Sequence, residues 1–238
     1  MKARQLLSAA VVAGIVLLAL LGNAAADLYF ESEQTSQGIP GQQPGTSIVK
    51  QYVSHDGTTT DMGDRITIFD FKEKMMYDLD KTAKTYTRSP IDKMGMPAEG
   101  ATGPDAEQAK MMQQMMKSMA GSIKVTPTGI VETIGGYKCR KYVVNMMMAQ
   151  SDYWATKEFK GYDEMKEIAE KAAKVFEANP MMKQMNIMGL MKELDGFPIK
   201  TATQVMGGSI VTVVKKIEQK KLDKDLFKVP AGYKLVAQ

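Results

Sequence analysis

The chain has 238 residues, which is enough for one domain with a sizeable core, and its formal net charge is +4. It contains one cysteine and one histidine. These counts exclude an internal disulfide and a zinc site built from several histidines.

The first 26 residues have the three parts of a cleavable secretory signal. Lys2 and Arg4 make a positive start, residues 6–21 are mostly apolar, and small residues end at Ala26. The apolar run is shorter than the about 20 residues of a membrane-spanning helix. We therefore predict cleavage after Ala26, a periplasmic protein that is not membrane-anchored, and a single domain over 27–238. Loss of Lys2 and Arg4 lowers the charge from +4 to +2, and a near-neutral mature chain gives no electrostatic case for a nucleic-acid partner.

The first half of this domain has the pattern of a meander. Residues 65–71 alternate and are rich in Ile, Phe and Thr, a strand signal, and residues 75–79 form a returning strand. Short strands joined by tight turns pair antiparallel. The predicted strands are 28–35, 47–53, 65–71, 75–79 and 85–87.

A methionine-rich helix is predicted over residues 105–120, after a loop rich in Pro, Gly and Ala. Asp105 with Gln108 resembles a capping box, and Gly121 is a natural stop. Thioether side chains are flexible and polarizable, so a face built from them can line an adaptable apolar surface. Five methionines recur at helical spacing in this segment: Met111, Met112, Met115, Met116 and Met119.

Strands resume after this helix, with candidates over 122–126, 129–133, 137–148 and 152–156. In the strand 137–148 alternate residues point to one face. We expect that face to hold Tyr142, Val144, Met146 and Met148. A slip of one residue in register would expose the other set.

Two helices and a hairpin complete the predicted elements. An apolar stripe begins near Asp163 and ends where Asn179 and Pro180 break the helix. A second helix is predicted over 181–194. A hairpin then joins 198–206 to 209–218 through a Gly207-Gly208 turn, and the C-terminal tail is expected to be largely irregular.

These elements predict an α+β fold. The antiparallel strands form one curved sheet. The helices can bury their apolar faces by packing on the concave side of that sheet. A curved sheet covered by helices with flexible side chains leaves an apolar groove between the layers.

Four segments resemble an exported bacterial family known as domain of unknown function 4412. They are 134–142, 153–157, 161–164 and 222–233, and the meander from 69 to 86 is also similar. The resemblance implies a distant similarity to the periplasmic lipoprotein-carrier (LolA-like) fold, an open half-barrel plugged by helices that holds acyl chains. No catalytic residue comes with this family.

The residues give little support for catalysis or for a cofactor. His55 lies beside a predicted turn and is expected to be an ordinary exposed histidine, and Cys139 is expected to be a structural thiol. No phosphate loop, nucleotide fingerprint or nucleophile elbow is present in the sequence. We therefore expect a protein that is not an enzyme and that carries no cofactor.

Three binding functions stay open. The methionine face predicts a groove for a lipid, a lipidated protein or another apolar ligand. Clustered thioethers are also soft ligands that select Cu(I), and an envelope sensor or protein-interaction module fits the same features. We favour the apolar ligand. The expected groove lining is Met111, Met112, Met115, Met116, Met119, Tyr142, Val144, Met146, Met148 and Trp154.

Overall fold

The computed structural model describes residues 27–39, 43–94, 124–146, 149–185, 189, 192–205 and 207–236. Within them lie twelve strands, two short 3-10 turns and the helices α3 and α4. The strands are β1 (Leu28–Gln37), β2 (Gly45–Ser54), β3 (Gly57–Asp61), β4 (Arg65–Asp70), β5 (Met75–Asp80), β6 (Thr85–Pro90), β7 (Lys124–Ile134), β8 (Tyr137–Met146), β9 (Ala149–Thr156), β10 (Phe197–Val205), β11 (Gly208–Gln219) and β12 (Lys234–Leu235). The helical elements are η1 (Ile91–Lys93), α3 (Tyr162–Phe176), α4 (Pro180–Met185) and η2 (Lys224–Phe227).

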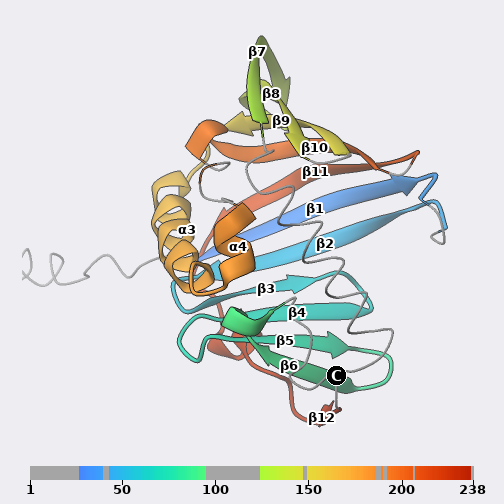
Figure 1. The fold of residues 1–238 in the computed structure, drawn as a ribbon, viewed down its shortest axis with the longest axis vertical. Coiled ribbons are helices and arrows are strands. Elements are labelled where there is room, and N and C mark those ends of the chain that lie inside the picture. Colours follow the sequence, from blue (N-terminus) through green and yellow to red (C-terminus); the bar gives the residue numbers. More distant parts are fainter. Residues whose placement is uncertain are drawn as a thin grey trace, which may run out of the picture.

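The described strands form one large curved sheet that is not closed (Figure 1). Its order is β12-β6-β5-β4-β3-β2-β1-β11-β10-β9-β8-β7. Neighbouring strands pair antiparallel except β12 and β6, which are parallel. The sheet confirms the predicted curved antiparallel architecture.

Two tight turns of the meander are stabilised by aspartate side chains. Oδ1 of Asp70 accepts the backbone N–H groups of Lys72 and Glu73, both at 2.9 Å. Oδ1 of Asp80 likewise accepts the backbone N–H groups of Thr82 and Ala83, both at 2.8 Å. An aspartate that bonds its own chain in this manner fixes a turn. The predicted strands 65–71 and 75–79 are confirmed almost to the residue, whereas β6 continues to Pro90, beyond the predicted end at residue 87.

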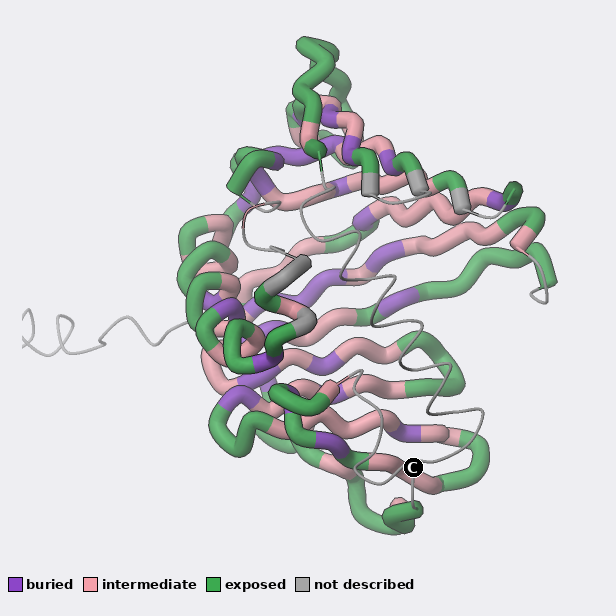
Figure 2. Tube along the Cα trace, viewed as in Figure 1, coloured by how far each residue is buried: buried purple, intermediate pink, exposed green. Residues whose placement is uncertain are grey.

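The main core gathers where β1 begins and α3 packs against the sheet. Leu28 and Phe30 on β1 are almost fully buried, as is Ile168 on α3. The ring of Phe30 stacks on Phe197 at 4.7 Å between centroids. Figure 2 shows buried residues in this region, whereas β7 is exposed along nearly all of its length. The core includes Leu28, Phe30, Val53, Phe71, Cys139, Trp154, Phe159, Ile168, Ile199 and Val214.

Helix α3 confirms the predicted amphipathic helix, and α4 begins one residue earlier than predicted. Proline is favoured at the first position of a helix because its missing N–H is not needed there. Asn179 precedes Pro180, and its Oδ1 accepts the N–H of Met182 at 3.2 Å, as a helix cap does. α3 contacts β2 and η1. The covering of the concave face by helices stays a prediction, because residues 105–120 lie outside the described part.

The predicted Gly207-Gly208 turn is wrong by one residue. Val205 pairs with Gly208, so Gly208 is already the first residue of β11. A side chain at Gly208 would place its Cβ 2.6 Å from the Gln37 carbonyl oxygen. The glycine therefore permits the close approach of the β1 end rather than forming the turn itself.

Strands β3 and β12 are absent from the prediction. β3 follows the His55-Asp56 turn and consists largely of threonine, a β-branched residue that suits strands. β12 is a two-residue strand whose pairing with β6 joins distant parts of the chain. Among the described residues, no helix has the length and apolarity needed to cross a membrane.

Candidate functional site

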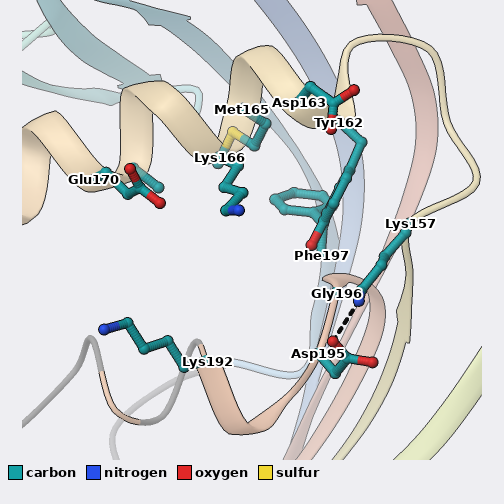
Figure 3. A pocket seen from close by; sticks show the side chains of 11 residues that line it. Lys157, Tyr162, Asp163, Met165, Lys166, Glu170, Lys192, Asp195, Gly196 and Phe197 are labelled. Carbon is teal, nitrogen blue, oxygen red and sulfur yellow. Dashed lines mark ion pairs between the residues drawn. The ribbon is translucent and has the colours of Figure 1, made fainter.

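A cleft of about 410 Å³ lies between α3 and the turn that leads into β10 (Figure 3). Spacings of three and four place one set of α3 residues on the same side of the helix. The wall formed by α3 consists of Tyr162, Asp163, Met165, Lys166, Ala169 and Glu170. The facing wall consists of Lys157, Lys192, Asp195, Gly196 and Phe197.

The facing wall is held in place by close backbone packing. A Cβ at Gly196 would lie 2.9 Å from the Thr156 carbonyl oxygen, so any side chain there would push β9 and β10 apart. Phe197 follows directly and stacks on Phe30 of the core. The apolar part of the cleft therefore rests on a rigid base.

Charged groups surround this apolar part. Lys157 and Asp195 form an ion pair across the end of the cleft, and the hydrogen bond from this pair raises the pKa of Lys157. Lys166 and Lys192 extend from opposite walls in Figure 3. Within the described residues neither of them forms an ion pair. The cleft thus combines an apolar surface with two cations that lack a carboxylate partner in the described part of the chain.

A second hollow of about 300 Å³ adjoins the beginning of α3. Lys157, Tyr162 and Asp163 line both hollows, and Glu164 and Gln219 line only the second. On the same helix, Glu164 and Glu167 lie close to His55 of the β2–β3 turn. Among the described residues, this is the group of side chains that could hold a metal ion.

The structure brings two of the predicted groove residues together. Tyr142 and Val144 are buried in a small cluster with Ala155 and Leu194. Tyr142 pairs with Tyr153 across β8 and β9. These residues therefore share one face of the sheet, as predicted from the alternation of the strand.

Trp154 lies on the opposite face of the β8–β9 pair. It pairs with Lys141, which is the sequence neighbour of Tyr142. The ammonium groups of Lys141 and Lys200 lie over its ring, at 4.9 and 4.3 Å from the centroid. Such contacts are cation–π interactions. Trp154 belongs to the main core and not to the cluster of Tyr142 and Val144.

The methionines of the predicted groove lie outside the described residues. This holds for Met148, for the side chain of Met146, and for the whole helical set Met111, Met112, Met115, Met116 and Met119. The methionine-lined groove and the Cu(I) alternative both stay predictions.

The two residues considered for catalysis have different surroundings. Cys139 is fully buried, and burial raises the pKa of its thiol, which confirms the predicted structural role. His55 lies at the predicted turn, but it is not an ordinary exposed histidine. Its Nε2 is 2.5 Å from a carboxylate oxygen of Glu164 on α3, and 29% of its side chain is exposed.

The cleft along α3 was not among the predicted sites. Met165 and Ala169 lie within the helix for which an apolar stripe was predicted, and this is the part of the cleft that the sequence indicated. In the structure Ile168 of that stripe enters the core, and Met165 both packs against this core and lines the cleft together with Ala169. The opposite wall comes from a turn whose position depends on the tertiary fold.

Residues 44–233 match a family model described as "Domain of unknown function (DUF4412)". The chain belongs to this family. DUF4412 membership confirms the resemblance found in the sequence. A search of curated proteins gave no match to this DUF4412 chain.

Several solved structures are similar to this DUF4412 chain at low identity. PNGF-II is 12% identical with a TM-score of 0.42, and the match covers 88% of this chain but only 30% of PNGF-II. A LolA-superfamily protein from Nitrosomonas europaea is 6% identical with a TM-score of 0.33. The match covers 86% of this chain and 91% of the Nitrosomonas protein. A β-barrel-like DUF1849 protein from Brucella abortus is 7% identical with a TM-score of 0.33. The match covers 82% of this chain and 98% of the Brucella protein. With scores this low, none of these similarities carries a functional conclusion.

Proposed function

We propose that this DUF4412 chain is a non-enzymatic periplasmic protein that binds a lipid, a lipidated protein or another apolar ligand. The cleft along α3 is the observation that carries the proposal. Its volume of about 410 Å³ falls within the range of about 300–1,000 Å³ that is typical of small-molecule sites. The methionine-lined groove predicted from the sequence is the second surface that we assign to the ligand.

The cleft has the chemistry that an acyl chain needs. Tyr162, Met165 and Phe197 offer apolar surface, and the Met165 thioether can adjust to chains of different shape. Each methylene buried there contributes about 0.8 kcal/mol. Lys166 and Lys192 lie where they can pair with a polar or anionic end of the ligand.

The described lining residues include no serine, threonine, cysteine or histidine. The tyrosine, lysine and carboxylate side chains of the lining can fix the polar end of a bound ligand. The export signal predicted over residues 1–26 supports a periplasmic location.

Filling the cleft tests the proposal. Ala169 is half-buried on the cleft side of α3, so Ala169→Phe would place a ring where the ligand is expected. We expect the fluorescent fatty acid cis-parinaric acid to bind the wild-type chain. We expect binding to be at least about tenfold weaker in the variant, a loss of about 1.4 kcal/mol.

Ala178→Phe is the matched control, because Ala178 is exposed just beyond the end of the same helix. It should bind the probe as the wild-type chain does. Absence of binding to the wild-type chain would count against the function. Equal binding by wild type and Ala169→Phe would remove the cleft as the site.

A further inference from the structure

Three side chains with metal-ligating atoms meet between the β2–β3 turn and α3. They are His55 of the turn and Glu164 and Glu167 of the helix, and one ligand atom from each lies within 4.8 Å of the other two. The closest pair is His55 Nε2 and Glu164 Oε1 at 2.5 Å. Glu164 and Glu167 are three residues apart, which places them on the same side of the helix.

Both elements that carry these ligands are firmly held. In the turn, Ser54 Oγ accepts the N–H of Asp56 and donates to the Gly57 carbonyl, both at 3.2 Å. Gly57 has no room for a side chain, since its Cβ would lie 2.3 Å from the Phe69 oxygen. α3 is anchored in the core by Ile168. The backbone positions that carry the three ligands are therefore fixed, which a metal site needs.

The charges of the group suit a divalent cation. Two carboxylates on one side of a helix repel each other. Within the described residues Glu167 forms no ion pair, and it is exposed on α3. With a neutral imidazole the three ligands carry a charge of about −2, which a divalent ion neutralises.

A separate feature leaves space beside the ligands. Glu164 also lines the hollow of about 300 Å³ at the beginning of α3, together with Gly161 and Gln219. Metal sites with three protein ligands keep a further position for water or for a bound molecule. The hollow offers such a position next to Glu164.

We propose that His55, Glu164 and Glu167 form a binding site for a divalent transition-metal ion of the Zn²⁺ class. One imidazole nitrogen and two carboxylate oxygens suit Zn²⁺. Mg²⁺ prefers oxygen ligands alone and keeps its water. The bound ion lies between His55 and Glu164 and ties α3 to the β2–β3 turn. This proposal does not depend on the proposed function.

Isothermal titration of the metal-free chain with Zn²⁺ tests the site. The chain must carry no histidine tag, and removal of residual metal by a chelator precedes the titration. We expect one Zn²⁺ per chain and a higher melting temperature with Zn²⁺ present. Glu167→Gln should weaken Zn²⁺ binding by more than about 10-fold. Replacing a residue that only hydrogen-bonds to a metal ligand already lowers metal affinity by about 10-fold or more, and Glu167 is proposed as a ligand itself. Mg²⁺ should not compete.

Glu177→Gln provides the control, because this carboxylate is exposed at the other end of α3. It should bind Zn²⁺ as the wild-type chain does. His55→Ala should lose binding while its circular dichroism spectrum stays that of the wild type. Absence of Zn²⁺ binding to the wild-type chain would overturn the proposal. Binding that Glu167→Gln and His55→Ala leave unchanged would overturn it as well.

Discussion

Asn179 joins the helical part of the chain to the end of the meander, and its replacement tests that connection. The side chain is fully buried. Its Nδ2 donates to the carbonyl oxygens of Ile91 and Met94 at 2.8 and 2.9 Å. Its Oδ1 accepts the N–H of Met182, the third residue of α4.

Asn179→Asp keeps the shape of the side chain but removes both donors. At neutral pH the carboxylate would face two carbonyl oxygens, each left without the donor that Asn179 supplies. A buried polar group that loses its partner costs about 1–3 kcal/mol. The Ile91 carbonyl oxygen keeps the N–H of Met94 as a donor at 3.3 Å. The Met94 carbonyl therefore sets the expected loss, about 1–3 kcal/mol in the free energy of unfolding, which is a large part of a marginal stability.

Urea unfolding measures this loss directly. The chain has a single tryptophan, Trp154, which lies in the main core and reports its unfolding by fluorescence. Asn145→Asp is the matched control, because Asn145 is exposed on β8, and it should change stability by less than about 0.5 kcal/mol. If Asn179→Asp is as stable as this control, our interpretation of the connection is wrong.

Other predictions concern a thiol, a glycine and an ion pair. Because Cys139 is fully buried, it should not react with Ellman's reagent in the native chain and should react once per chain in guanidinium; rapid native reaction would contradict its burial. Gly161 has a φ of +96° and a Cβ there would lie 2.6 Å from Leu28 Cδ2, so Gly161→Ala should cost about 1–3 kcal/mol in urea unfolding, and a neutral effect would refute the contact. The hydrogen bond from Lys72 lowers the pKa of Asp56, so this pair stabilises the fold above the unfolded-state pKa of about 3.9 and the contribution is lost as the pH falls through the lower folded-state pKa. Lys72→Met should therefore shrink the stability difference between about pH 7 and about pH 3, and an unchanged difference would argue against the pair.

Local patterns predicted α3 and the meander except β3, because the features that fix these elements lie within a few residues. The turns after Asp70 and Asp80 use side chains that bond their own backbone. Asn179 and Pro180 end one helix and begin the next through local capping. Such signals are visible in one sequence and do not require knowledge of the tertiary fold.

Features that depend on distant segments could not be predicted. β12 exists because the C-terminal tail returns to β6. The cleft needs the turn at Gly196 to face Met165, and the metal group needs His55 to face Glu164, 109 residues further along the chain. Alternation placed Tyr142 and Val144 on one face. No local pattern indicated that Trp154 lies on the opposite face of the β8–β9 pair.

Native mass spectrometry of the chain purified from the periplasm without detergent tests the central claim most directly. Our account predicts an added mass of an acyl-containing molecule, released on denaturation and depleted in Ala169→Phe but not in Ala178→Phe. Repeated spectra of the ligand-free chain alone would contradict it.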